Sequence, residues 1–339
     1  MILKNCILQN NIVQSNDMQQ PILSICIPTY NRAKKLKECL ESVRIQLANS
    51  TDLNEMVEVV ISNNASTDET ESIIEHYKPL FKNYRYTKNQ HNIGLDKNVI
   101  NVVKSAHGTY CWYLGDDDTI IDGGIRHILS LLQTNKYDVL TVEAEPVTKH
   151  TTPSKAKKFR EDSIIEVIDP NEFYFRGFCQ GGFSVLVFNR ELWLKCLNEE
   201  KYLPHWVYFE TVLHMLIKTK KHMVNVHEFV VVTGQDCRWS ENGTEIYTFI
   251  NSNLLLERMI EFGFDKERIT TDLRKNKKQI FIILLRAKGH GLTINKENLT
   301  YIYTKSHVGP LYLLPITLIY FIPNSIIVAI RTIKKKISR

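Results

Sequence analysis

The chain lacks the cysteine and histidine patterns that mark disulfide frameworks and zinc sites. Its 7 cysteines occur singly, without a Cys-x-x-Cys pair, so we expect reduced thiols, several of them in the core. His214, His222 and His227 have no regular metal-site spacing, and we expect them to be surface or core residues. The first 20 residues lack the uninterrupted apolar run of a secretory signal, so we expect the catalytic body to stay in the cytoplasm.

A strong bias of composition is also missing. Apolar residues make up 43% and charged residues 24% of the 339, which is typical of a folded protein rather than a fibrous or disordered one. We find no internal repeat. The net charge of +6 is largely a feature of the tail, because Arg331, Lys334, Lys335, Lys336 and Arg339 fall within the last nine residues. A solvated terminus is the simple alternative, but the tail suits an anionic membrane surface, and no nucleic-acid partner is expected.

Strands and helices alternate through the first part of the chain. The apolar runs 23–28 and 57–62 are each followed by a polar turn and an amphipathic helix, and a third strand at 109–115 ends at an acidic cluster. This alternation predicts an α/β fold with a mostly parallel sheet and helices on both faces. Ligands bind at the carboxyl ends of the strands in such sheets, which is where the polar loops fall.

The pattern changes beyond the sheet. Residues 244–288 are helical and amphipathic, whereas 308–330 carry no charge over a length that suits a bilayer span. Pro315, Pro323 and the pair 324–325 interrupt this run, which favours a broken, re-entrant or surface-lying segment over a buried core helix. We therefore divide the chain into an N-terminal extension (1–21), a catalytic domain (22–240), a helical region (241–306) and an apolar membrane-associating segment with a basic tail (307–339).

The acidic cluster Asp116, Asp117 and Asp118 is the centre of the expected site. Carboxylate oxygens on a short turn suit a hard cation such as Mg²⁺ or Mn²⁺, which also binds substrate phosphates. Adjacent carboxylates repel one another, so a bound cation would relieve a local cost. An isolated turn of this kind would be read as solvated, and the neighbouring motifs decide against that reading.

Four stretches together resemble family 2 glycosyltransferases in order and spacing. They are SICIPTYNR at 24–32, ISNNASTD at 61–68, NIG with Lys97-Asn98 at 92–98, and LGDDD at 114–118. The resemblance covers about residues 22–240 and implies the GT-A fold, a Rossmann-like sheet that carries a nucleotide-sugar site. The second and fourth stretches are most similar to bacterial O-antigen and surface-polysaccharide transferases of the abequosyltransferase-like type.

The resemblance also implies roles for single residues. The donor contacts would be Pro28, Thr29, Tyr30 and Arg32 around the nucleotide, Asn63 beside the base, Asp96, Lys97 and Asn98 near the ribose or diphosphate, and Asp116 and Asp117. Asp118 would be the principal metal ligand, with Asp116 as the second. Many relatives have Asp where this chain has Asn63, which leaves the identity of the base open.

The acceptor side is marked less clearly. Inverting relatives carry an acidic pair at a helix start, where this chain has Phe209-Glu210-Thr211, so Glu210 is the candidate base and a surface glutamate is the alternative. Residues 235–239 match the QxxRW pattern of processive members, with Arg238 and Trp239 as a lid over the diphosphate or a sugar-stacking wall, or with Trp239 in the core. Residues 178–183 would form the acceptor side, with His205 and Trp206 as secondary candidates.

These patterns predict a hexosyl- or deoxyhexosyltransferase that moves one sugar from a nucleoside-diphosphate sugar to a lipid-linked saccharide. It would be peripheral or monotopic on the cytoplasmic face of the inner membrane and would serve O-antigen or capsule biosynthesis. Two alternatives stay open. A catalytically silent membrane-bound sensor of sugar nucleotides would explain the missing second acid, and a sugar nucleotidylyltransferase is opposed by PTYNRAK in place of its glycine-rich loop.

Overall fold

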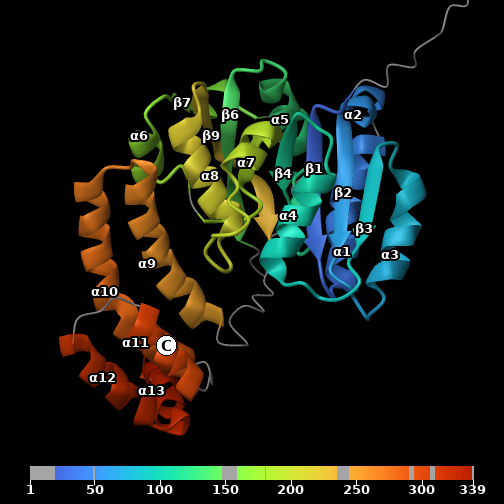
Figure 1. Cartoon of the computed structure of the whole chain (residues 1–339). Helices are drawn as coiled ribbons and strands as arrows, with labels where there is room; N and C mark the ends of the chain where they lie inside the picture. The colour runs from blue at the N-terminus through green and yellow to red at the C-terminus, as the bar shows by residue number, and fades with distance from the viewer. Residues whose placement is uncertain are drawn as a thin grey trace, which may run out of the picture.

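A single mixed sheet forms the centre of the molecule. The computed structural model describes residues 20–48, 50–146, 159–179, 181–234, 244–289, 294–305 and 310–337. The strands within them follow the order β3-β2-β1-β4-β8-β6-β9-β5, and β7 also pairs with β9 (Figure 1). They are β1 (Leu23–Thr29), β2 (Val57–Asn63), β3 (Tyr84–Lys88), β4 (Tyr110–Tyr113), β5 (Thr119–Ile120), β6 (Tyr137–Pro146), β7 (Ile164–Val167), β8 (Leu186–Asn189) and β9 (His222–Thr233).

Strand direction divides the sheet unevenly. β1 pairs in parallel with β2 and β4, β2 with β3, and β6 with β9, whereas β8 is antiparallel to both β4 and β6. β5 and β7 are antiparallel to β9. Six strands therefore run one way and β5, β7 and β8 the other. The mostly parallel α/β sheet is confirmed, and the reversed strands are an addition that the sequence pattern did not predict.

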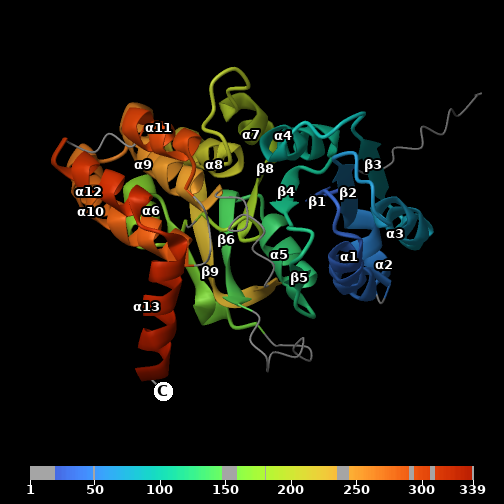
Figure 2. The ribbon, with the colours of Figure 1, turned by 90° about the horizontal axis from the view of Figure 1, so that it is seen from below.

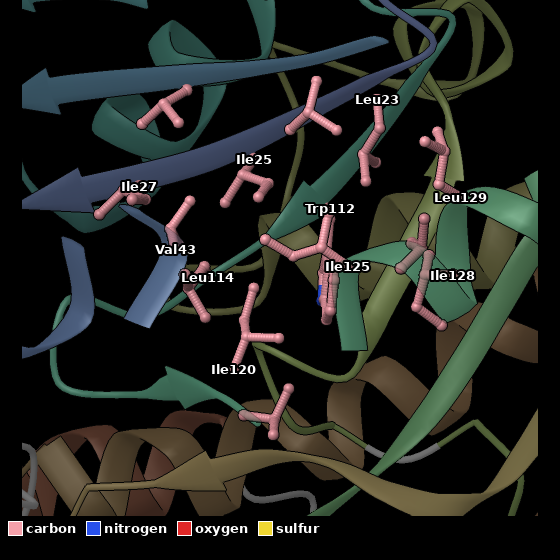
Figure 3. Packing of buried hydrophobic residues seen from close by; sticks show 14 of the residues in the cluster. Leu23, Ile25, Ile27, Val43, Trp112, Leu114, Ile120, Ile125, Ile128 and Leu129 are labelled. Carbon is pink, nitrogen blue, oxygen red and sulfur yellow. The ribbon is translucent and has the colours of Figure 1, made fainter. Parts of the chain in front are cut away.

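Two layers of helices cover the sheet because its central strands are apolar on both faces. Ile25 and Ile27 of β1 pack with Val43, Ile125 and their neighbours on one face, as Figure 3 shows, whereas Cys26 of β1 faces the second cluster. This is the two-residue period of an extended strand. The first face is covered by α1 (Ala33–Ala48), α3 (Thr70–Tyr77) and α5 (Gly124–Leu132), and the second by α4 (Leu95–Ser105), α7 (Arg190–Cys196) and α8 (Val207–Lys218). The shorter helices are α2 (Thr51–Met56) and α6 (Pro170–Phe175).

Five helices at the end of the chain pack to one side of the sheet (Figure 1). They are α9 (Thr244–Phe262), α10 (Lys266–Gly289), α11 (Lys296–Lys305), α12 (Pro310–Phe321) and α13 (Asn324–Ile337). Leu255 and Met259 of α9 join the core cluster that also contains the apolar residues of α8. Ile250, near the start of α9, belongs instead to a separate helical core with Leu284 and Ile302. The helical C-terminal region therefore has a core of its own and is anchored to the sheet through α9.

The uncharged run near the end of the chain folds as two helices that meet at a sharp bend. No single helix among the described residues is long and apolar enough to cross a membrane, but Leu311–Phe321 and Asn324–Ile330 meet those criteria as a pair bent by 92°. Pro315 lies inside α12 without ending it, contrary to the expectation, and the break falls around Pro323. Lys288 holds the bend, because its Nζ donates to the carbonyl oxygens of Ile319 (3.1 Å) and Tyr320 (2.9 Å) at the end of α12.

Five cysteines and three histidines that the sequence singles out have structural surroundings. Cys26, Cys39, Cys111, Cys179 and Cys196 are free and buried, which confirms the expected core thiols within the described residues. The Nδ1 atoms of His214, His222 and His227 lie 3.1 Å from the Cys196 carbonyl oxygen, 3.0 Å from Glu166 and 2.8 Å from Glu143, respectively.

Candidate active site

A cavity of about 700 Å³ opens at the carboxyl ends of β1, β4 and β9. The chain leaves β1 toward β2 and β3 and returns to β4 on the other side of β1, so the cavity lies where the strand order reverses. Open α/β sheets bind ligands at such points. The lining residues are Pro28, Thr29, Tyr30, Arg32, Asn64, Asn92, Gly94, Leu95, Asn98, Gly115, Asp116, Asp117, Asp118, Gly181, Phe183, His205, Trp206, Tyr208, Thr233 and Gly234.

The acidic turn after β4 is tied to the loop after β1. Thr29 Oγ1 donates a hydrogen bond of 2.7 Å to Asp116 Oδ2. Arg32 Nη1 lies 2.7 Å from Asp117 Oδ2 and 3.5 Å from Asp116 Oδ1. The two strand-end loops, far apart in sequence, thus share one cluster of charges inside the cavity.

Asp118 is held from the opposite side by residues at the start of β8 and the end of β9. The backbone N–H of Gly234 donates to its Oδ1 at 2.8 Å, and the hydroxyl of Ser184 donates to its Oδ2. Ser184 Oγ also accepts the N–H of Gly115 at 2.7 Å. Position 234 requires glycine, because a Cβ there would lie 2.4 Å from the carbonyl oxygen of Asp117. The orientation of Asp118 is therefore fixed by its own turn, by Ser184 before β8 and by Gly234 after β9.

Burial gives these carboxylates unusual protonation behaviour. Asp116 is 7% exposed and Asp118 is 8% exposed. Burial raises the pKa of Asp116 to about 7 and that of Asp118 to about 6, although Arg32, Thr29, Ser184 and Gly234 act in the opposite direction. Arg32 contributes one positive charge beside the three aspartates of the turn. The turn therefore has an excess of negative charge when all three are ionised.

The turn offers carboxylate oxygens that a divalent cation could share with substrate phosphates. Every carboxylate oxygen has more than one lone pair, so the bonds to Ser184 and Gly234 leave capacity on Asp118. The described residues hold no group of three or more His, Cys, Asp or Glu side chains that could bind an ion by themselves. A cation of the Mg²⁺ type is usually held by one or two carboxylates together with substrate phosphates, which matches a site of this composition.

Most of the residues that line this cavity lie in a segment that matches a family model. Residues 24–190 match "Glycosyl transferase family 2". This matched segment of the chain belongs to that glycosyltransferase family. The matched segment runs from the first residues of β1 to the end of β8 and so contains the acidic turn.

Curated relatives of this chain are named as bacterial glycosyltransferases. The abequosyltransferase RfbV of Salmonella typhimurium is 39% identical over 117 residues, which are 33% of this chain and 32% of that protein. The "GalNAc(5)-diNAcBac-PP-undecaprenol beta-1,3-glucosyltransferase" of Campylobacter jejuni is 27% identical over 110 residues, 32% of this chain and 34% of that protein. The matches therefore span about a third of these two relatives.

Solved structures share the fold over most of the chain. S. aureus TarS (residues 1–349) superimposes with a TM-score of 0.57 at 17% identity, covering 83% of this chain and 78% of that one. The mannosyltransferase PcManGT of Pyrobaculum calidifontis, in complex with GDP-Man and Mn²⁺, gives a TM-score of 0.54 at 14% identity over 89% and 87%. This likeness confirms the expected GT-A glycosyltransferase fold.

Most of the nucleotide-contact residues expected from the sequence line this cavity. Pro28, Thr29, Tyr30, Arg32, Asn98 and the three aspartates line it. Asn63 does not, because its side chain is fully buried, donates to Glu71 and Tyr86, and accepts the N–H of Ser66 at 2.9 Å. The neighbouring Asn64 lines the cavity instead and accepts the N–H of Ile93 at 3.0 Å. The residue of this pair that lines the cavity is thus Asn64, one position after the expected Asn63.

Asp96 and Lys97 are also outside the cavity wall. The carboxylate of Asp96, in the first turn of α4, accepts the backbone N–H groups of His205 (2.7 Å) and Val207 (3.3 Å). Burial raises the pKa of Asp96. Lys97 is exposed. Asp96 therefore orders the segment before α8, and it is not among the residues that line the cavity.

Glu210, the candidate base, is turned away from the cavity. It is 5% exposed, its Oε2 accepts the N–H of Leu203 at 2.7 Å, and its Oε1 lies 2.7 Å from Arg258 Nη1. Burial raises the pKa of Glu210. The structure does not bring Glu210 together with the acidic turn, and Thr211 donates its hydroxyl to the carbonyl oxygen of Val207. This helix therefore presents neither residue to a substrate in the cavity.

Aromatic residues form part of the cavity wall and were only partly expected. Gly181, Phe183, His205 and Trp206 line the cavity and were named from the sequence, whereas Tyr208 was not. Tyr208 donates its hydroxyl to the Gly181 carbonyl oxygen at 2.6 Å. A Cβ at Gly181 would meet Trp206 at 2.9 Å. Ser184 and Gly234, which bind Asp118, carry no local sequence signal that would have predicted this contact. Arg238 and Trp239 lie outside the described residues.

Proposed function

We propose that this protein transfers a single sugar from a nucleoside-diphosphate sugar to a saccharide acceptor in bacterial surface-glycan biosynthesis. The observation that carries the proposal is the cavity in which Arg32 and the buried carboxylates Asp116 and Asp118 meet at a strand-order reversal. Such a site offers an aromatic ring for the nucleobase, the guanidinium of Arg32 for the phosphates, and carboxylates for a metal ion. Family membership supports the reaction class, and the relatives' names support the setting.

In this proposal the donor lies along the β1 and β4 ends of the cavity. Tyr30 is 39% exposed and offers a ring face for the nucleobase, while Asn64 and Gly94 form the neighbouring wall. Arg32 would share its charge between Asp117 and the diphosphate. Asp118 and Asp116 would hold Mg²⁺ or Mn²⁺, which when bound would stabilise the charge developing on the departing diphosphate. The Mn²⁺ in the complex of PcManGT supports a metal here.

The aromatic wall would receive the acceptor sugar. Phe183, Trp206 and Tyr208 offer apolar ring faces on the cavity wall. Sugars present patches of C–H groups that pack well on such faces, and the ring edges leave their hydroxyls free for hydrogen bonds. Close packing of Gly181 on Trp206 keeps this wall in place.

A lipid-linked acceptor and a membrane-surface location belong to the same proposal. Leu311, Leu314, Leu318 and Phe321 form an exposed stripe on α12, whose opposite side is buried through Ile316 and Ile319. Exposed apolar patches of this kind mark interaction surfaces. Figure 2 shows α13 extending from the helical region toward the basic end of the chain. The undecaprenol diphosphate in the Campylobacter relative's name supports an acceptor of this class on the cytoplasmic face of the inner membrane.

The reaction class is tested by product analysis. The protein is incubated with Mn²⁺ and with UDP-, GDP-, CDP- or dTDP-sugars, first alone and then with saccharide acceptors. We expect one nucleotide class to bind, and its nucleoside diphosphate to be released faster when acceptor is present. Binding without any turnover would favour the silent sensor, and release of pyrophosphate from a nucleoside triphosphate and a sugar phosphate would favour the nucleotidylyltransferase.

Membrane association predicts a large effect of substitutions on α12. Replacing Leu314, Leu318 and Phe321 by serine should lower partition onto anionic lipid vesicles at least about a hundredfold, since each buried side chain of this type contributes about 1.5 kcal/mol or more. Co-sedimentation with the vesicles measures the change. The matched control replaces Ile45, Leu80 and Ile168, which are also exposed on the catalytic domain, and should leave partition unchanged. Equal losses in both variants would overturn the assignment to α12.

A further inference from the structure

His205 lies on the acceptor wall of the cavity. It stands directly before Trp206, the N-cap of α8, and both residues line the cavity with Gly181, Phe183 and Tyr208. Among the described lining residues His205 is the one histidine. The remaining titratable group on that wall, the hydroxyl of Tyr208, is committed to the Gly181 carbonyl oxygen, and burial raises the pKa of Tyr208.

The backbone of His205 is held in a specific conformation. Its φ of 67° is in the left-handed region, which residues other than glycine occupy infrequently. The N–H of His205 donates to Asp96 Oδ2 at 2.7 Å, and the carbonyl oxygen of Pro204 accepts from Asn251 Nδ2 at 2.8 Å. Two different helices, α4 and α9, therefore fix the peptide units around this residue. Backbone conformations of this kind persist where the surroundings hold them, often at functional sites.

Among the described residues, the other carboxylates that could take a proton here are engaged in other contacts. Glu210 is bound to Leu203 and Arg258 and does not line the cavity. Asp116 accepts from Thr29, Asp117 pairs with Arg32, and Asp118 accepts from Ser184 and Gly234. Histidine is the residue type most often used as a general base, and this one is placed on the wall where an acceptor hydroxyl would lie.

We propose that His205 is the general base of the transfer reaction, an inference that rests on the proposed function. A ring nitrogen of His205 takes the proton of the acceptor hydroxyl while the hydroxyl oxygen forms a bond to the anomeric carbon of the donor sugar. The bond from that carbon to the diphosphate oxygen breaks, and its electron pair leaves with the nucleoside diphosphate. The proton then passes from the imidazole to solvent. Asp96 acts as a positioning residue through the backbone of His205.

The test uses two substitutions that the left-handed backbone tolerates. His205→Asn keeps a polar side chain of a type found at positive φ, and His205→Gly has no steric penalty there and leaves room for a small base. Each should lower kcat for transfer by about 10²- to 10⁴-fold, the usual contribution of a general base. Donor affinity, measured by calorimetry with the nucleoside diphosphate and Mn²⁺, should stay within about twofold of the parent protein, since the residue acts on the acceptor.

Added imidazole distinguishes a base from a structural residue. It should restore part of the transfer rate of His205→Gly and none of that of His205→Asn, because only the glycine variant has space for it. His227→Asn, which changes an exposed histidine paired with Glu143, is the matched control and should behave as the parent. A kcat within about threefold of the parent in both His205 variants would overturn the role of His205 while leaving the proposed function intact. A parent protein that binds and turns over no sugar nucleotide would overturn both.

Discussion

We expect Asp118→Asn to abolish sugar transfer while leaving the fold intact. Asparagine has the size of aspartate and retains an oxygen for the N–H of Gly234 or the hydroxyl of Ser184, so the turn keeps its shape. It loses the charge that would bind a cation beside the diphosphate. Metal stabilisation of a leaving group amounts to several kcal/mol, so transfer should fall by a factor on the order of 10³ or more. Burial raises the pKa of Asp118, which means that its charged form is disfavoured, and the neutral amide should unfold at the same or a higher temperature.

The measurements are nucleoside diphosphate release and thermal unfolding of the same preparations. Asp122→Asn is the matched control, because Asp122 is an exposed carboxylate a few residues further along the chain. It should retain the activity of the parent. Substantial activity in Asp118→Asn, or in the parent protein treated with a chelator, would remove the metal from the mechanism. Loss of activity accompanied by a large drop in unfolding temperature would instead assign Asp118 a structural role.

The general fold was predictable because it follows from periodicity. Strand β1 reads as an unbroken apolar run, and its residues alternate between the two cores, which only a sheet covered on both faces allows. The acidic turn was located correctly for the same reason. Asp116 closely follows the buried strand β4, so its place at the carboxyl edge is dictated by the strand itself.

The structure places two expected site residues, Asn63 and Glu210, away from the cavity wall, because a single residue decides which way a side chain points. Asn63 ends β2 and turns into the protein, whereas Asn64 lies one position further and reaches the cavity. Neighbouring residues at a strand end differ in direction, and a motif match does not fix that register. Glu210 is the corresponding case in a helix. Its position around the axis of α8 directs its side chain to Arg258 instead of the cavity.

Other parts of the site depend on contacts between segments far apart in sequence. Ser184 reaches Asp118 across 66 residues, and Gly234 does so across 116. Serine and glycine are common in loops, so neither position carries a local signal. The reversed strand β8 has the same cause. It brings Ser184 next to β4, but its four residues are too short for a periodic pattern to reveal direction.

The stability of the metal-free protein should fall as the pH rises from about 5 to 8. Burial raises the pKa of Asp116 to about 7 and that of Asp118 to about 6, both above the ordinary value of 3.8. The folded protein therefore binds more protons than the unfolded chain in this window, and the stability associated with the protonated carboxyls is lost as they ionise. Thermal unfolding with a chelator present, recorded across this range, measures the decline.

Saturating Mn²⁺ should reverse that decline, because the cation binds the ionised carboxylates. An ion present at about a hundred times its Kd adds about 2.7 kcal/mol, or roughly 5 °C in a chain of this size. We expect this increase at about pH 8 and little or none at about pH 5.5, where protons compete for Asp116 and Asp118. The double variant Asp116→Asn with Asp118→Asn should lose both the pH dependence and the response to Mn²⁺. If Mn²⁺ stabilised the parent equally at both pH values, the ion would be held by groups other than these two buried carboxylates.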